Sequence, residues 1–589
     1  MVASTQPHAN NAGMEILRSG GNAVDAAVAM AAALNVCEPT STGIGGDAFA
    51  LFFRASDKTV HAMNGSGRSP AGLSLERVLA DLPDGATELP PLHAHCVTVP
   101  GAAAAWADSV AKWGSGSLSL AEVLAPAVKL ARDGVPIGPI AADMWARSAD
   151  RLRASGAANM LVSDAGGARA PRTGELWRSP ALAATFEALG EGGKAAFYGA
   201  ESPIAKAIVA AVAARGGTMS LEDLGAHSTE WPTPISVPYA GRVRVWECPP
   251  NGQGVAALIA LNIAEAAAET AVARRGPAGE EAARGGTPLG SLPAAERAHI
   301  LLCSMRLAFA DARRFVADPA ATSVPTEGLL SKAYAATRAS QIPPFDGEGE
   351  GVVGGDAAHG APEFGSDTVS FQVVDSTGNA VAYINSNYMG FGSFIEPEGT
   401  GFTLQNRGAN FSLDATHPNC AAPSKRPYHT IIPCLGTLLS DEPSGGPVPV
   451  PADGGGGADG GGGGGLRAGS LLFSASVMGG FMQPQGHLQV VSNLVDMGME
   501  PQAALDAPRF CIEDGSAGGE AFLEDGTPAA VASALAARGH KLGRGDGEGG
   551  CVDGWHRSLF GRGQVIWRDD SGTLWGGSDP RGDGCAAGW

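Results

Sequence analysis

The sequence predicts a protein that combines β-sheets with helices, and two stretches support this most directly. In the stretch 365–374 (GSDTVSFQVV), apolar and polar residues alternate from Thr368 onward, which is typical of a half-buried strand. A turn is expected at 375–379, and 380–384 has the pattern of a second strand. The alanine-rich segment 22–35 has the pattern of a helix. We therefore expect both kinds of element in one fold.

The other elements are predicted from the same local signals. A first helix stops at Gly20-Gly21, and Asn22 is expected to cap the next helix with Asp25 at its third position. An apolar run at 48–53 and a strand-like stretch at 59–63 follow. Further helices are expected at three places: 102–132, 181–215, and from an opening at 249–254 through Ala267.

Thr368 stands at the first position of the predicted strand, after a glycine-started junction, and this has two interpretations. It is either an ordinary β-residue or a self-processing nucleophile. Cleavage before Thr368 would free an α-amine beside its own hydroxyl. Such an amine has a reference pKa near ~7.7–8.0, so it can act as a general base at neutral pH. The Asp367-Thr368 dipeptide alone does not decide between the two.

Glycine- and proline-rich stretches predict loops in three places. The segments 274–292 and 347–360 have the composition of mobile loops, and the second lies just upstream of Thr368, where a junction about to be cut needs slack. The segment 441–467 is dominated by proline and glycine and cannot order itself into a packed core. We therefore expect a flexible surface insertion there.

Composition excludes several classes of function. The chain has 589 residues and a net charge of −20, which argues against a nucleic-acid partner and weakly against an anionic membrane surface. The 9 cysteines form no CxxC pair, so we expect reduced, mostly buried thiols. No secretory signal is visible, and the longest apolar run, 26–34, is too short to span a bilayer. A cytoplasmic protein is expected, unless the chain lacks its true start.

Two weaker patterns are set aside. The glycine turn at 38–47 has neither a GxGxxG register nor a GK[ST] motif, which argues against nucleotide binding. His93, His95 and Cys96 offer three ligand types without a fourth nearby, so they are interpreted as loop residues. No cofactor and no metal are expected.

Several stretches, in the same order along nearly the whole chain, resemble the γ-glutamyltransferase (γ-glutamyltranspeptidase, glutathione hydrolase) family of N-terminal-nucleophile hydrolases. Before the nucleophile they are GGNAVDAA at 20–27, Glu38-Pro39, GIGG at 43–46 and VPG at 99–101. From the nucleophile onward they are Asp367-Thr368, Val374-Asp375, GNAV at 378–381, FGS at 391–393, GTG at 399–401, Asn406, Phe411-Ser412, KRP at 425–427 and Gly479-Gly480.

This resemblance implies an α+β fold, a four-layer αββα sandwich, made as one precursor that cuts itself before Thr368. The large chain would be 1–367 and the small chain 368–589, forming a heterodimer. Thr368 would attack a γ-glutamyl-type amide to give an acyl-enzyme, released by water or an amino-acid acceptor. Ser386 would support the nucleophile. Gly479 and Gly480 would supply the oxyanion hole, where glycine lets the backbone approach the developing charge.

The substrate pocket departs from the family's usual pattern. Tyr388 precedes Phe391-Gly392, Arg407 stands where a glutamine is expected, and Asn410 stands where an aspartate is expected. A serine pair becomes His429-Thr430. The pocket thus loses the carboxylate for a substrate α-ammonium and gains a guanidinium suited to a carboxylate. Another candidate for binding the substrate carboxylate is Arg68, which lies two places from the family's position.

These changes, with the motif MQPQGH at 482–487, are similar to the acyltransferase-like branch of the family. Three hypotheses follow. The first is an autoprocessing γ-glutamyl hydrolase or transferase. The second is an acylase for amides of acids without an α-amino group, as in the glutaryl-cephalosporin acylase relatives, and Arg407 and Asn410 favour it. The third is an unprocessed precursor that serves as a binding protein.

Overall fold

The computed structural model describes residues 1–165, 167–346, 366–439 and 467–589, and its centre is a pair of six-stranded antiparallel sheets. The predicted loop at 347–360 and nearly all of the predicted insertion at 441–467 lie outside these residues. The first sheet has the strand order β18 (Cys585–Ala587), β1 (Val2–Ser4), β10 (Ser366–Val374), β11 (Ala380–Met389), β2 (Asp47–Arg54), β3 (Thr59–Gly65). The second has the order β17 (Leu574–Ser578), β16 (Arg562–Arg568), β13 (Leu471–Met478), β12 (Cys434–Leu438), β9 (Val243–Glu247), β8 (Ile235–Tyr239).

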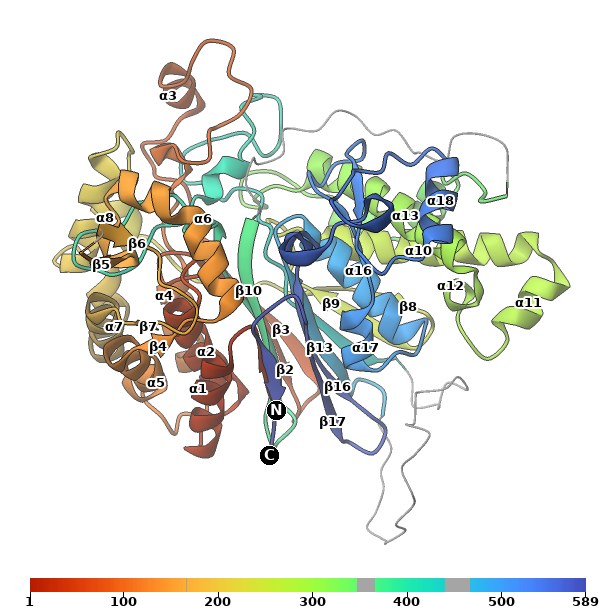
Figure 1. Ribbon diagram of the computed structural model, residues 1–589, viewed down its shortest axis with the longest axis horizontal. Helices are drawn as coiled ribbons and strands as arrows, with labels where there is room; N and C mark the ends of the chain where they lie inside the picture. The colour runs from red at the N-terminus through yellow and green to blue at the C-terminus, as the bar shows by residue number, and fades with distance from the viewer. Residues whose placement is uncertain (166, 347–365, 440–466) are drawn as a thin grey trace, which may run out of the picture.

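The two sheets face each other in the middle of the molecule, and helices cover their outer faces (Figure 1). A small apolar cluster that includes Phe49 and Leu51 of β2, Ile384 of β11 and Leu435 of β12 fills the space between the sheets. Two much larger clusters lie between each sheet and its helices. The predicted four-layer αββα sandwich is therefore confirmed.

One helical layer covers the first sheet. Its helices are α1 (Pro7–Arg18), α2 (Ala23–Cys37), α4 (Ala102–Trp113), α5 (Leu120–Asp133), α6 (Pro139–Ser155), α7 (Pro180–Tyr198) and α8 (Pro203–Ala213). Every residue of α2 is buried, which explains why small alanines occupy all its faces. Asn22 caps α2 and Asp25 closes the capping box, as the sequence predicts.

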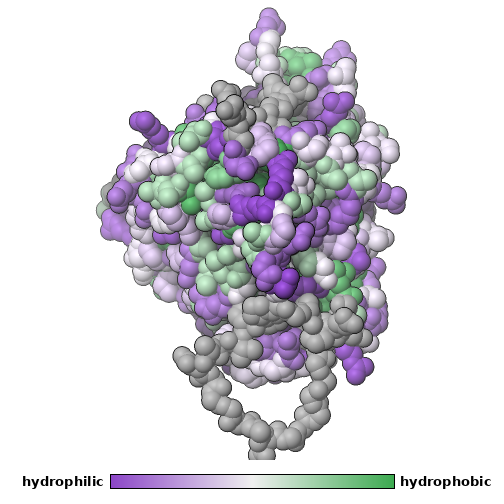
Figure 2. Space-filling model, turned by 90° about the vertical axis from the view of Figure 1, so that its right-hand side faces the viewer, coloured by the Kyte–Doolittle hydropathy of each residue, from purple (hydrophilic) through white to green (hydrophobic). Residues whose placement is uncertain are grey.

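The other helical layer covers the second sheet. Its helices are α10 (Gly254–Arg274), α11 (Pro277–Ala283), α12 (Pro288–Ser291), α13 (Ala294–Phe315), α14 (Thr326–Leu329), α15 (Lys332–Ala339), α16 (Met482–Val495), α17 (Pro501–Asp506) and α18 (Ala529–Ala537). By length and composition α10 could cross a membrane, but 72% of its apolar window is buried inside the protein. On the outer face of this layer, hydrophilic residues are spread among smaller hydrophobic areas (Figure 2).

Smaller elements decorate these four layers. They are α3 (Leu75–Ala80), α9 (Leu221–Gly225), and the strand pairs β4 (Val135–Pro136) with β7 (Leu176–Trp177), β5 (Val162–Asp164) with β6 (Gly167–Arg169), and β14 (Phe510–Ile512) with β15 (Ala521–Leu523).

Three boundary predictions are wrong. The segment 102–132 is not one helix: α4 ends at Gly114, and Ser119 starts α5 with its own capping box. The segment 181–215 is likewise divided between α7 and α8, with Ser202 capping the second. The segment 274–292, predicted to be a mobile loop, contains α11 and α12, whose buried Leu289 packs into the core.

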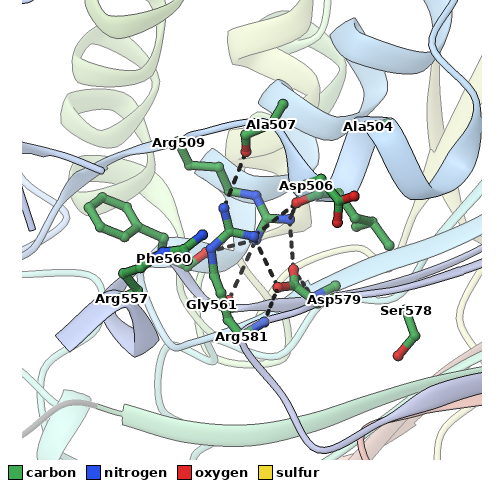
Figure 3. A network of polar contacts seen from close by, with 12 residues as sticks. Ala504, Asp506, Ala507, Arg509, Arg557, Phe560, Gly561, Ser578, Asp579 and Arg581 are labelled. Carbon is green, nitrogen blue, oxygen red and sulfur yellow. Dashed lines mark hydrogen bonds and ion pairs between the residues drawn. The ribbon is translucent and has the colours of Figure 1, made fainter. Parts of the chain in front are cut away.

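A network of buried charges fixes the C-terminal end of the chain (Figure 3). Arg509 donates to Asp579 (2.7 Å), and Arg581 donates to Asp579 (3.0 Å) and to Glu524 (2.6 Å). All four side chains are buried, so each charge is matched where water cannot reach it. The carboxylate of Asp583 accepts from the backbone N–H groups at the start of α6.

Candidate active site

Thr368 lies on β10, between β1 and β11, with its side chain fully buried. The pairing of β10 with β11 shifts between Asp367 and Val369, so Thr368 sits at an irregularity of the ladder. Such irregularities re-aim a side chain and are common beside active sites. The Oγ1 atom of Thr368 lies 3.0 Å from the Oγ atom of Ser386 on β11.

Tyr388 and Arg407 both donate to Ser386. The backbone N–H of Tyr388 donates to Ser386 Oγ over 2.8 Å, and Nη2 of Arg407 donates to it over 3.2 Å. The second guanidinium nitrogen, Nη1, donates to Thr430 Oγ1 over 2.7 Å. The structure therefore brings Thr368, Ser386, Arg407 and Thr430 together in one hydrogen-bonded chain.

A carboxylate that the sequence analysis did not single out completes this chain. Asp47 is fully buried at the start of β2, with Oδ2 3.9 Å from Arg407 Nε and 3.1 Å from His429 Nε2. The backbone N–H of Gly67 donates to its Oδ1 over 3.0 Å. No local signal in the sequence points to this pairing, because the need of Arg407 for a counter-charge follows from its burial, which only the structure shows.

Burial dominates the electrostatics of this cluster. It raises the pKa of Asp47 to about 7, against the opposing effect of Arg407. It lowers the pKa of Arg407 to about 10, partly offset by Asp47. It also lowers the pKa of His429 well below its ordinary value, and the two arginines Arg407 and Arg426 act in the same direction. His429 is therefore a neutral imidazole beside Asp47.

Tyr388 separates this cluster from a cavity of about 350 Å³. The guanidinium of Arg407 lies 4.5 Å above the Tyr388 ring, and the Tyr388 hydroxyl donates to Asn410 Oδ1 over 2.7 Å. Tyr388 has φ of 78°, an unusual backbone conformation for a bulky residue. Tyr388 and Asn410 both line the cavity, whereas Thr368 and Arg407 do not.

The cavity walls are aromatic with few charges. Other lining residues include Met389, Phe411, His417, Asn419, Tyr428, Phe481, Arg313 and, at its exposed edge, Glu88. The Arg313 guanidinium lies 4.6 Å from the Phe481 ring and donates from Nε to Gly515 O over 2.8 Å. The helical pattern of α13 does not distinguish Arg313 from the other arginines of this helix, so no local signal in the sequence points to it.

The Gly479-Gly480 pair lies between the end of β13 and the start of α16. Both residues have positive φ, 126° and 55°, which favours glycine. On the facing strands, Ser370 lies against Ser476 and Gln372 against Ser474, so the nucleophile and the glycine pair lie toward the same end of the sandwich. The N-terminus of α16 adds a positive dipole end there, which suits an oxyanion.

Gln253 connects the Gly479-Gly480 turn to Thr430, which is a hydrogen-bond partner of Arg407. Its Nε2 donates to Gly480 O over 2.8 Å and to Thr430 O over 2.7 Å, and its Oε1 accepts from the Tyr428 hydroxyl over 3.1 Å. This fully buried amide thus anchors the Gly480–Phe481 peptide, which directly follows the two N–H groups that the family resemblance assigns to the oxyanion hole.

Arg68 is placed away from the cavity. Its guanidinium pairs with Asp318 over 2.6 Å and with Glu230 over 3.0 Å. Arg68 is not among the residues that line the cavity, whereas Arg313 is. Asp367, the residue before the expected cleavage point, pairs on β10 with Tyr388 of β11.

His93, His95 and Cys96 do not form a metal cluster within the described residues. His95 Nε2 lies 2.8 Å from Asp81 Oδ2, and Cys96 Sγ donates to the carbonyl of Pro90. Their interpretation as loop residues is wrong for His95 and Cys96, which are buried in a short 3-10 helix, Ala94–Cys96, that His93 caps.

Comparison with known proteins gives a consistent picture. The family described as Gamma-glutamyltranspeptidase matches residues 9–452 and 466–589. A "Glutathione hydrolase-like YwrD proenzyme" of Bacillus subtilis (strain 168) is 33% identical over 593 residues, covering 100% of this chain and 98% of the relative. An "Acylase ACY 1 proenzyme" of Pseudomonas sp. (strain SE83) is 30% identical over 552 residues, covering 92% and 87%. The crystal structure of a cephalosporin acylase from Bacillus halodurans superposes with a TM-score of 0.79 at 38% identity, covering 100% of this chain and 95% of that one. The chain therefore belongs to the gamma-glutamyltranspeptidase family, and the predicted family of N-terminal-nucleophile hydrolases is confirmed.

Proposed function

We propose that the protein is a self-processing acylase that carries an acyl group on Thr368 and favours acyl donors without an α-ammonium. The composition of the cavity beside Tyr388 is the observation that supports this substrate preference. Its side chains include the neutral amide of Asn410 and the cation of Arg313, and its carboxylate, Glu88, is exposed to water. Such a wall suits a carboxylate-bearing acyl chain and offers little to a buried ammonium.

Maturation would take place at the peptide bond between Asp367 and Thr368, which lies on β10. Thr368 Oγ1 attacks the carbonyl carbon of Asp367, the C–N bond breaks, and the nitrogen becomes the α-amine of Thr368. Water then hydrolyses the resulting ester and releases the carboxylate of Asp367. The products are the two chains 1–367 and 368–589. The word "proenzyme" in the names of the relatives supports this step.

The strand pairing gives cleavage a second consequence. Before cleavage, the backbone of Ser366 pairs with Met389 and that of Asp367 with Tyr388, and both partners also line the cavity. After cleavage, Asp367 is a free chain end. When it moves away from Tyr388, the route from the cavity to Thr368 opens. The buried hydroxyl then becomes the nucleophile for a substrate amide.

In the mature enzyme the α-amine of Thr368 accepts the hydroxyl proton while Oγ1 attacks the substrate carbonyl. The N–H groups of the 479–480 turn stabilise the oxyanion, and the leaving amine takes the proton. Water, activated by the same amine, hydrolyses the acyl-enzyme. Ser386 and Arg407 hold Thr368 in place throughout.

A second candidate is a γ-glutamyl hydrolase or transferase, which the name of the Bacillus subtilis relative favours. Matched chromogenic amides distinguish the two. We expect kcat/KM for glutaryl-p-nitroanilide to exceed that for γ-glutamyl-p-nitroanilide, which differs only by the α-ammonium. A clear preference for the γ-glutamyl amide would overturn the proposed acylase and favour the second candidate.

The processing step has its own test. Wild-type protein should run as two fragments, the smaller beginning at Thr368, and Thr368→Ala should remain one chain without activity. Efficient cleavage of the variant at the same bond would exclude self-processing by this hydroxyl. A single intact wild-type chain without activity would instead support an unprocessed binding protein.

A further inference from the structure

Two histidines and one cysteine meet in the interior, far along the chain from the nucleophile. His299 and Cys303 lie four residues apart on α13, so their side chains share one helix face. His540 follows α18, which packs against α13. All three side chains are buried, and one ligand atom from each lies within 4.8 Å of the others.

The hydrogen bonds define which ring nitrogens carry protons. His299 Nε2 lies 3.0 Å from the carbonyl oxygen of Pro343, which can only accept, so Nε2 carries the proton. With the proton at Nε2, the lone pair of the His299 ring is at Nδ1, which lies 2.8 Å from His540 Nε2 and 3.8 Å from Cys303 Sγ. An imidazole whose second nitrogen donates to a carbonyl is typical of metal ligands.

The charge around the three residues selects the kind of ion. The guanidinium groups of Arg306 and Arg538 place positive charge near the Cys303 thiol and the His540 imidazole. Arg306 is fully buried, and its Nε and Nη2 find no hydrogen-bond partner among the described residues. A divalent ion with one thiolate would add a positive charge beside these cations. A monovalent ion with one thiolate adds none, and soft sulfur and imidazole ligands suit Cu⁺.

A cavity of about 360 Å³ reaches the site. Its lining includes His299 and Pro343, the carboxylates of Glu269, Glu296 and Asp346, and the guanidinium groups of Arg274 and Arg275. The carboxylates outnumber the guanidinium groups on this path, which favours the entry of a cation. A second buried trio, formed by Glu247, Cys434 and His487, lines neither this cavity nor the one beside Tyr388.

We propose that His299, Cys303 and His540 form a site for one monovalent copper ion. On binding, the Cys303 thiol loses its proton to solvent and the thiolate coordinates Cu⁺. The ring proton of His540 moves from Nε2 to Nδ1, so that Nε2 and His299 Nδ1 can coordinate. The two nitrogens separate from 2.8 Å to about 3.5 Å, the spacing around a three-coordinate ion with bonds of about 2 Å. No oxidation is involved, and one proton is released per ion.

The test uses the full-length protein as purified, kept reduced and free of oxygen, with Cu⁺ delivered from and competed by bicinchoninate. We expect one Cu⁺ retained per chain, release of one proton per ion, and an X-ray absorption spectrum with one sulfur and two nitrogen neighbours. Cys303→Ser and His540→Gln should lower the apparent affinity by about 100-fold or more, because each removes a ligand rather than an outer-shell contact. Cys511→Ser, which removes an equally buried thiol elsewhere, should retain the ion.

Three results would overturn the proposal: no retained copper, unchanged retention in Cys303→Ser, or Zn²⁺ held more tightly than Cu⁺ by the same residues. Thermal melting without copper verifies that each variant is folded. Because serine nearly matches cysteine in size, Cys303→Ser decides the question if the histidine variant does not fold.

Discussion

Asn410→Asp tests the substrate preference most directly, because the structure shows which atom would change. Asn410 Oδ1 accepts from the Tyr388 hydroxyl over 2.7 Å, and its Nδ2 is buried without a hydrogen-bond partner among the described residues. In the aspartate, one oxygen can keep the Tyr388 bond while the second replaces Nδ2 at the cavity wall. No existing hydrogen bond of the side chain is lost.

The expected magnitude follows from the new charge. A carboxylate beside a substrate α-ammonium makes a charge-assisted hydrogen bond of roughly 1.5–3 kcal/mol, which corresponds to about a 10- to 150-fold gain in kcat/KM for γ-glutamyl amides. Arg313 lines the same cavity and can pair with the new carboxylate, so we expect a gain near the lower end of this range. A glutaryl amide has no ammonium to satisfy, and its rate should fall or stay unchanged.

The assay compares kcat/KM of the γ-glutamyl and glutaryl p-nitroanilides for wild type and variant. Thr87→Asp is the control, because it adds a carboxylate to the lining of the same cavity at an exposed position. It should not reproduce the change in preference. An equal response of both donors to Asn410→Asp would show that residue 410 does not face the α-position of the acyl group, and would refute the reasoning.

Three further outcomes are expected. Arg407→Lys should slow both maturation, measured by gel, and turnover, measured as kcat, by at least about tenfold. One ammonium cannot hold Ser386 Oγ and Thr430 Oγ1 together as the planar guanidinium does. Normal rates would exclude this positioning role. Burial raises the pKa of Asp47 to about 7, so the folded state keeps a proton that the unfolded state releases. The free energy of unfolding should therefore lose a contribution as the pH rises from about 4 to about 7, and Asp47→Asn should remove that dependence in denaturant titrations; an unchanged pH dependence would contradict it. Replacing 441–467 by a few residues should leave the Tm nearly unchanged, since halving a flexible loop changes its closure entropy by only about 0.6 kcal/mol; a fall of more than about 5 °C would mean that the segment packs against the body.

The sequence by itself determined the elements whose signals are local. The alternation after Thr368 predicts β10, and the Asn22 cap with Asp25 predicts the start of α2. The ordered motifs predict the family and hence the four-layer fold. Helix ends were predicted less well, because the alanine-rich composition on both sides of a break was given more weight than the break itself. Between α4 and α5 the stretch 114–117 is Gly-Ser-Gly-Ser, which is a local signal for the end of a helix, and Ser119 is a signal for the start of the next.

Only the tertiary structure decided which charges face one another in the site. The sequence placed Arg407 in the pocket as a partner for a substrate carboxylate, whereas the structure pairs it with Asp47, 360 positions earlier in the chain, and sets Arg313 in the cavity wall. Arg68, the other candidate for binding a substrate carboxylate, forms ion pairs with Asp318 and Glu230 instead of lining the cavity. A long charged side chain reaches whichever counter-charge packing brings near, and that choice depends on contacts between distant segments rather than on local pattern.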